Sequence, residues 1–211
     1  FEMPGDKSIT HRALLFGALA EGVTTIEGAS TGGDCVTTRR CLESVGVRFE
    51  SDPEFPYLRV HGTATLQAPA SVLDCGNSGT TLRLLMGVLA GSTIEAELSG
   101  DESLNRRPME RVARPLRLMG ARIETTLGRP PLTVSGAPLR GASVTPEAAS
   151  AQIKGAILLA ALGAEGTTIV HEPVATRDHT ERMIRSFGGA LEVRGKEIRI
   201  DGPQKLKATH V

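Results

Sequence analysis

The segment PGDKSITHR at residues 4–12 places two cations and two hydroxyls at the start of an apolar run. Lys7 is a point charge with three N–H donors, which suits a phosphate or a carboxylate. Ser8 can cap a helix or bind a ligand oxygen, and Arg12 follows four residues later on the same helical face. The segment predicts an anion site, although an N-capping serine between two solvated cations fits the local sequence equally well.

A second candidate is the turn GNSGTTLR at residues 76–83, which enters another apolar helix. Its glycines permit close approach of the backbone to an anion, and Asn77, Gly79 and Arg83 are the candidate contacts. The spacing of a Walker A motif is absent. A purely structural turn is the alternative.

A third candidate is SAQIKG at residues 150–155, where an apolar helix again begins. Ser150 and Gln152 offer neutral hydrogen-bond donors beside Ala151, and Lys154 lies just beyond them. The alternative is a capped and buried helix without a ligand.

Two arginine-bearing segments precede further helices. GDESLNRRPM at residues 100–109 brings Arg106 and Arg107 to a helix entrance, where the helix dipole disfavours cations. TRDHTER at residues 176–182 offers Arg177. We expect at least one of Arg106 and Arg107 to face water, and the alternative is that both do. In the second segment, the alternative is an N-cap and a solvated helix face made of Asp178, His179, Glu181 and Arg182.

These segments recur because the chain contains an internal threefold repeat. Each repeat has a polar turn, an apolar helix and a β-branched strand, then an amphipathic helix and two short strands. The approximate repeats are 1–67, 68–138 and 139–211. A glycine follows each amphipathic helix, as expected for a left-handed residue that ends a helix. These closing glycines are Gly46, Gly120 and Gly189.

The repeat predicts a single α/β (α+β) domain over residues 1–211, made of three β-α-β-α-β-β units about a pseudo-threefold axis. The apolar helices should lie inside and the sheets outside. In such an assembly the three apolar helices can begin at the same end of the domain. Their unpaired N–H groups would then form an anion cradle lined with hydroxyls and amides.

Composition narrows the classes of function. The chain has no formal net charge at pH 7 and only 3% aromatic residues, which argues against nucleic-acid binding. No apolar run approaches the roughly 20 residues that span a bilayer. Cys35, Cys41 and Cys75 form an odd set without CxxC spacing, so we expect reduced thiols in a cytoplasmic protein and no metal.

Taken in order, five segments resemble the 5-enolpyruvylshikimate-3-phosphate (EPSP) synthase family of the bacterial type. The resemblance covers nearly the whole chain. It implies an enolpyruvyl transferase of the shikimate pathway, which leads to the aromatic amino acids, without a metal or organic cofactor. The five segments are PGDKSITHRALLFGALAEG, GNSGTTLRLL, GDESLNRRPMERV, SAQIKGAILLAAL and EPVATRDHTERM.

The family transfers the enolpyruvyl group of phosphoenolpyruvate to the 5-hydroxyl of shikimate 3-phosphate and releases phosphate. The resemblance also implies two lobes of three units each, described as inside-out α/β barrels, with the active site between them. This chain would be one lobe, and segments 1–6 and 206–211 would be the crossovers to the other. The segment KATHV would begin the return strand.

Carried over by motif, the resemblance implies two groups of binding residues. Lys7 would act in catalysis and contact both substrates. Shikimate 3-phosphate would contact Lys7, Ser8, Arg12, Ser150, Ala151, Gln152 and Arg177. Phosphoenolpyruvate would contact Lys7, Asn77, Gly79, Arg83, Arg107 and Gln152.

Two positions bear on specificity. Ala151 stands where many relatives have serine, which removes one hydroxyl contact to the phosphate. Gly79 is the small residue typical of enzymes that are sensitive to glyphosate, a herbicide that resembles phosphoenolpyruvate in its site. The resemblance therefore makes the parent enzyme a glyphosate target.

The acid and base carboxylates of the family belong to the other lobe, so this chain alone should be inert or nearly so. A UDP-N-acetylglucosamine enolpyruvyl transferase lobe is one alternative, but its usual cysteine loop is not evident, and DKSITHR fits the shikimate enzyme better. A stand-alone anion-binding module without chemistry is the other.

Overall fold

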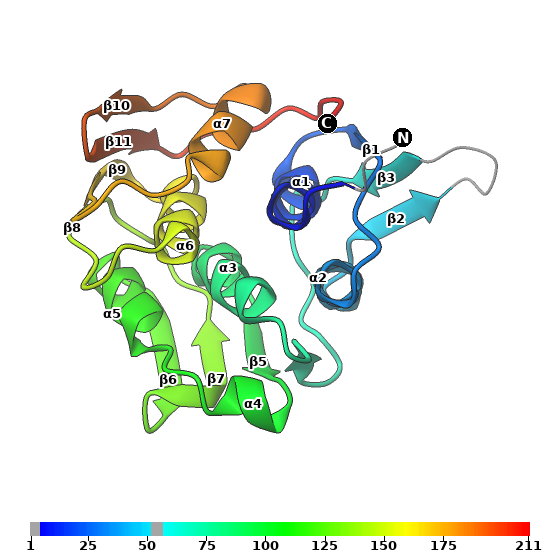
Figure 1. Ribbon diagram of the computed structural model, residues 1–211, viewed down its shortest axis with the longest axis horizontal. Helices are drawn as coiled ribbons and strands as arrows, with labels where there is room; N and C mark the ends of the chain where they lie inside the picture. The colour runs from blue at the N-terminus through cyan, green and yellow to red at the C-terminus, as the bar shows by residue number, and fades with distance from the viewer. Residues whose placement is uncertain (1–4, 52–56) are drawn as a thin grey trace.

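The computed structural model describes residues 5–51 and 57–211. The elements follow one another in three similar units (Figure 1). The first unit contains α1 (Lys7–Leu19), β1 (Val23–Glu27), α2 (Gly33–Ser44), β2 (Arg48–Ser51) and β3 (Tyr57–His61). The second contains β4 (Leu73–Asp74), α3 (Gly79–Ala90), β5 (Glu95–Ser99), α4 (Glu102–Asn105), α5 (Glu110–Leu118), β6 (Arg122–Thr126) and β7 (Arg129–Ser135). The third contains β8 (Ser143–Val144), α6 (Ala151–Ala161), β9 (Gly166–His171), α7 (His179–Ser186), β10 (Glu192–Arg194) and β11 (Glu197–Gly202).

The second and third units form sheets of the same topology. Their strand orders are β4-β5-β7-β6 and β8-β9-β11-β10. In each sheet the short first strand pairs in parallel with the next, and the remaining pairs are antiparallel. The predicted α/β class and unit order are therefore confirmed, apart from the short helix α4, which the sequence reading did not separate from α5.

The sheet of the first unit, β1-β3-β2, is completed from the other end of the chain. Residues 207 and 210 form parallel bridges to residues 21 and 25. The Val211 N–H donates to the Thr25 carbonyl across 2.9 Å, and the Glu27 N–H donates to the Val211 carbonyl across 2.8 Å. Segment 206–211, assigned by sequence to the third repeat, thus occupies the edge position that β4 and β8 occupy in their own sheets. Residues 1–4 of the expected crossover 1–6 lie outside the described residues.

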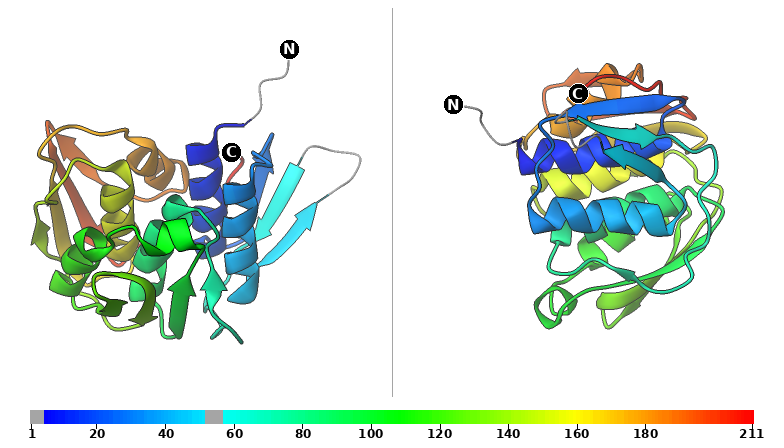
Figure 2. Two further views of the ribbon diagram at one scale, coloured as in Figure 1. Left: turned by 60° about the horizontal axis from the view of Figure 1, so that its bottom comes forward. Right: turned by 90° about the vertical axis from the view of Figure 1, so that its right-hand side faces the viewer.

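The core lies between the three sheets. The helices α1, α3 and α6 are buried along most of their length, and the sheets lie outside the helices (Figure 2), as predicted. Helices α3 and α6 approach closely because position 87 is glycine: a Cβ there would lie 2.2 Å from the Ala156 carbonyl oxygen. Among the described residues, no helix has the length and apolar character to cross a membrane.

The amphipathic helices α2, α5 and α7 end in similar ways. Gly46 and Gly120 have φ values of +92° and +100°, which confirms them as left-handed closing residues. At the third helix the prediction was wrong by one residue. Gly188 has the positive φ of +79°, while the N–H of Gly189 bonds back to the Ile184 carbonyl.

Candidate anion-binding site at the helix N-termini

The N-termini of α1, α3 and α6 are each closed by a side-chain cap. Ser78 and Ser150 accept the N–H groups of the third following residues across 3.1 and 3.4 Å. In α1 the cap is Asp6, whose Oδ1 accepts the Ile9 N–H across 2.8 Å. The capping alternative for Ser8 is therefore wrong. Ser8 lies one residue inside the helix, half-buried, where its hydroxyl is not needed as the cap.

Arg12 ties α1 to α6 and α7. Its Nε donates to the Thr180 hydroxyl across 2.7 Å, Nη1 to the Ser8 carbonyl across 2.9 Å and Nη2 to the Ala151 carbonyl across 3.3 Å. The side chain is buried, so the alternative of a solvated cation is wrong. Burial lowers the pKa of Arg12, and the nearby carboxylate of Glu181 opposes that shift. Arg12 therefore lies beneath Ser8 and Ala151 and joins their two helix ends.

Gln152 ties α6 to α3. Its Oε1 accepts a hydrogen bond from Arg83 Nη1 across 2.6 Å, and its Nε2 donates to the Thr80 hydroxyl across 2.7 Å. Burial lowers the pKa of Arg83, and the positive charges of Arg111 and Arg107 lower it further. A cluster of cations held this closely favours an anion among them.

The turn before α3 holds Arg107. Nη2 of Arg107 donates to Asn77 Oδ1, and Asn77 Nδ2 donates to Asp101 Oδ2, both across 2.6 Å. The hydrogen bonds from Asn77 and the Leu104 backbone lower the pKa of Asp101. Arg106 turns outward and pairs with Glu102, so only Arg107 of the two arginines joins this cluster. The expectation that at least one of the two arginines faces water is confirmed by Arg106.

Gly79 lies against both guanidinium groups of this cluster. A Cβ at position 79 would be 2.7 Å from Arg83 Nη1 and 3.2 Å from Arg107 Nη1. The absence of a side chain therefore lets the two cations converge over the first turn of α3.

Lys7 pairs with Asp34, in the first turn of α2, and its side chain stays 57% exposed. The sequence reading missed Asp34, although an acid at the start of a helix is a common stabilising feature. The Lys7 ammonium is thus held near the helix ends while it remains open to solvent.

A buried chain of hydroxyls, also missed from the sequence, fixes the ends of α1, α2 and α3. His11 Nδ1 pairs with Thr38 Oγ1, Thr38 Oγ1 with Thr81 Oγ1, and Thr81 Oγ1 with Ser78 Oγ, each across 2.7 Å. Burial lowers the pKa of His11 to about 4, so the imidazole is neutral near pH 7. The sequence alone could not connect these residues, because they belong to three helices that meet only in the folded structure.

The segment before α7 carries Arg177, which is exposed. Its charge is close enough to lower the pKa of Arg12. Asp178 precedes α7, but its carboxylate makes no capping hydrogen bond, contrary to the predicted alternative. Glu181 is buried, so the expected solvated face is wrong at that position.

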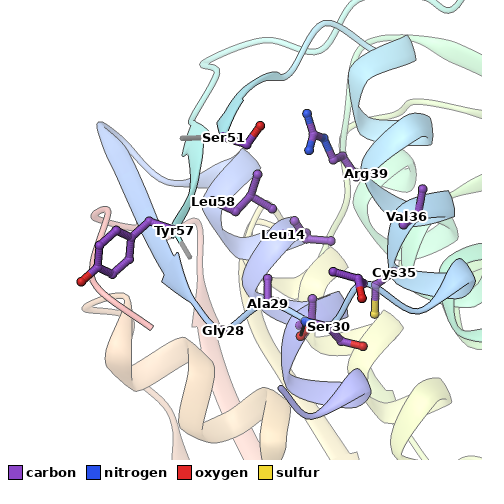
Figure 3. Close-up of a pocket in the computed structure, with 12 residues that line it drawn as sticks. Leu14, Gly28, Ala29, Ser30, Cys35, Val36, Arg39, Ser51, Tyr57 and Leu58 are labelled. Carbon is purple, nitrogen blue, oxygen red and sulfur yellow. Dashed lines mark hydrogen bonds between the residues drawn. The ribbon is translucent and has the colours of Figure 1, made fainter. Parts of the chain in front are cut away.

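A cavity of about 330 Å³ lies between α1, α2 and the first sheet (Figure 3). Leu14, Leu58 and Val36 contribute apolar surface, and Cys35 lines one wall. The Cys35 thiol donates to the Lys7 carbonyl across 3.6 Å, and burial raises its pKa. All three cysteines are free and buried, as small core side chains would be. Among the described residues, no group of His, Cys, Asp and Glu has a metal-binding arrangement.

The candidate residues therefore gather around three helix ends, and the arrangement favours oxyanions. Backbone N–H groups, the serines at 8 and 150, and the cations at 7, 83, 107 and 177 supply donors of the kinds that phosphate and carboxylate groups require. The fold and these donors define an α/β domain with a candidate anion-binding site at one end of its three buried helices.

Comparison with known proteins gives the family. Residues 1–211 match the EPSP synthase (3-phosphoshikimate 1-carboxyvinyltransferase) family, and the chain belongs to it. It is 50% identical to the 3-phosphoshikimate 1-carboxyvinyltransferase of Geobacillus kaustophilus and 48% identical to that of Bacillus subtilis, over 100% and 99% of this chain. An EPSP synthase structure from Acinetobacter baumannii is 46% identical, with a TM-score of 0.96, and the match covers 100% of this chain and 48% of that one. The chain spans about half the length of the curated relatives it matches.

Proposed function

We propose that the chain is the shikimate 3-phosphate-binding lobe of an enzyme that transfers the enolpyruvyl group of phosphoenolpyruvate to the 5-hydroxyl of shikimate 3-phosphate. The observation that carries the proposal is the linkage of the three helix ends, through Arg12 between α1 and α6 and through Gln152 between α6 and α3. Family membership over the whole chain supports the same reaction.

The N-terminus of α6 is the proposed site of the phosphate of shikimate 3-phosphate. Ser150 and Gln152 supply a hydroxyl and an amide, Ala151 supplies its backbone N–H, and the helix dipole adds partial positive charge. Ser8, Arg12 and Arg177 complete this half of the site, with Lys7 between the two ligands. Arg12 contributes mainly by holding Ser8 and Ala151 in place and by its charge, because its three nitrogens already bond within the protein.

The N-terminus of α3 is the proposed site of phosphoenolpyruvate. Arg83 and Arg107 converge over Gly79, and Asn77 orients Arg107. Gln152 lies between the two halves through its bond to Arg83. The two anionic ligands would then lie side by side, and Lys7 would neutralise charge that both share.

The second half of the enzyme is the proposed partner of this lobe. Addition to an enol ether needs a proton donor and a base near the attacking hydroxyl. Of the carboxylates at these helix ends, Asp6 caps α1, Asp34 pairs with Lys7, and Asp101 accepts from Asn77. We therefore expect no turnover by this chain alone. Neither a metal nor an organic cofactor is required in the proposal, and the free thiols support a cytoplasmic location.

Titration of the chain with shikimate 3-phosphate, followed by amide NMR, tests the proposal. Shifts should cluster at residues 8, 12, 150–152 and 177, with weak affinity because half of the cleft is missing. Phosphate release should be undetectable until the second lobe is added. Arg177→Gln should weaken the response, while Arg194→Gln, an exposed arginine on the outer strand β10, should not.

Two outcomes would contradict the proposal. Equal responses to shikimate 3-phosphate and to inorganic sulfate would indicate a general anion-binding module. A stronger response to UDP-N-acetylglucosamine would indicate the related transferase class.

A further inference from the structure

Lys154 lies out of contact with solvent, one turn into α6, with a side chain that is 2% exposed. Its Nζ lies 2.6 Å from Glu181 Oε1 and 3.1 Å from Glu172 Oε2. A buried ammonium group is costly unless it is paired, and here two buried carboxylates supply the opposite charge. The three side chains come from α6, from the end of β9 and from α7.

Glu172 connects this lysine to the segment that carries Arg177. It is the first residue after β9, and its Oε1 accepts both the Thr176 N–H, across 3.1 Å, and the Thr176 hydroxyl. Its other oxygen accepts from Lys154. One carboxylate thus closes residues 172–176 into a turn and anchors that turn to α6. Arg177 is the next residue along the chain.

Glu181 connects the same lysine to α7 and to Arg12. Its Oε2 is buried without a hydrogen-bond partner among the described residues, so Lys154 provides the main compensation for its charge. The neighbouring Thr180 accepts the Nε donor of Arg12. Two buried cations and two buried carboxylates therefore lie together behind the helix ends, with balanced formal charge.

We propose that Lys154 is a positioning residue, which fixes residues 172–178 and α7 against the N-terminus of α6 through Glu172 and Glu181. It touches no proposed ligand. Arg177 and the residues 150–152 are brought to one surface because the same lysine belongs to α6 and holds the turn before α7. The consequence for shikimate 3-phosphate rests on the proposed function, whereas the positioning itself is a property of the fold.

Amide hydrogen exchange at Thr176 measures the positioning without any ligand. In Lys154→Met, which keeps the length of the side chain and removes its charge, exchange at Thr176 should accelerate by about tenfold or more, because Glu172 loses its anchor. Lys205→Met is the matched control, since Lys205 is exposed and pairs with Glu21 away from this cluster. Unchanged protection of Thr176 in a folded Lys154→Met variant would overturn the proposal.

A second variant separates positioning from charge balance. Lys154→Met combined with Glu181→Gln removes one charge of each sign and should fold even where the single variant does not. Fast exchange at Thr176 should persist in it, because Glu172 still lacks its partner on α6. Restored protection of Thr176 would show that Lys154 acts only by neutralising buried charge, and would overturn the proposal.

A titration with shikimate 3-phosphate separates this proposal from the proposed function. If wild-type chain responds, the double variant should keep the shifts at residues 150–152, lose those at 177 and bind about tenfold more weakly, as expected for one lost charge-assisted contact. Equal affinity would overturn the role of Lys154 in binding. A silent wild-type chain would count against the proposed function, while the exchange experiment would still decide the positioning.

Discussion

Gly79 lies so close to Arg83 that a methyl group at position 79 would be 2.7 Å from Nη1 of that arginine. The obstacle is the end of a flexible side chain, and position 79 is the first residue of α3, where alanine is a good helix former. Gly79→Ala should therefore leave the free energy of unfolding within about 1 kcal/mol of wild type. The added methyl group should displace the Arg83 guanidinium from its hydrogen bond to Gln152.

The displacement of Arg83 can be followed in the side-chain amide signal of Gln152. With the second lobe present, Gly79→Ala should weaken inhibition by glyphosate and raise the KM for phosphoenolpyruvate, since both ligands would meet the added methyl group. Gly33→Ala is a control in the first turn of another helix, because a Cβ there meets nothing within 4 Å. Unchanged glyphosate inhibition would contradict the placement of Gly79 in the site.

The fold was largely predictable because its repeat is visible in the residues themselves. Apolar helices, β-branched strands and closing glycines recur three times at similar spacings, and the first helix of each unit is buried along most of its length. The completion of the first sheet was not predictable in the same way. Lys207 and His210 form bridges to residues 21 and 25, which are far away in the sequence. A local sequence pattern does not indicate so distant a partner.

The helix starts at the candidate site were predictable where polar residues directly precede an apolar run, as at Ser150. Prediction failed where burial depends on other elements. Glu181 and Arg12 have the local sequence of solvated side chains, yet both are buried, because Lys154 and Thr180 supply their partners. The cap of α1 is Asp6 and not Ser8, because the helix already begins at Lys7 and the Asp6 carboxylate accepts the Ile9 N–H.

Arg12→Lys should destabilise the chain although it conserves charge. Lysine lacks the planar fork that reaches Thr180, Ser8 and Ala151 at once. The loss of two or three bonds at a buried site should lower the free energy of unfolding by about 3 kcal/mol, measured by urea denaturation. Arg40→Lys on the exposed face of α2 is the matched control. Equal midpoints for the two variants would contradict the structural role of Arg12.

His11 should make the chain sensitive to acid. Its pKa is lowered to about 4 in the folded state, mainly by burial, while an unfolded histidine keeps its ordinary value of 6.5. The unfolded chain therefore takes up the proton first as the pH falls below 6.5, and stability declines until about pH 4. The full effect of this one group is about 3 kcal/mol.

The variant His11→Asn isolates that effect. Asparagine can still pair with Thr38 near the Nδ1 position, but it cannot titrate. The free energy of unfolding of wild type minus that of the variant should fall steadily from pH 7 to pH 4, because only the wild type loses stability through His11. A difference that stays constant over this range would show that His11 is not the titrating group.

The edge strand formed by residues 206–211 should contribute measurably to stability. The Ala208 N–H donates to the Glu21 carbonyl across 3.0 Å, whereas Thr209 takes part through its carbonyl oxygen, which accepts the Thr25 N–H across 3.1 Å. Proline removes the N–H and leaves the carbonyl. Ala208→Pro should therefore cost about 2 kcal/mol or more, and Thr209→Pro clearly less. Thermal and urea unfolding of the two variants would measure the difference. Equal losses would mean that proline acts here through backbone stiffness and not through the missing hydrogen bond to Glu21.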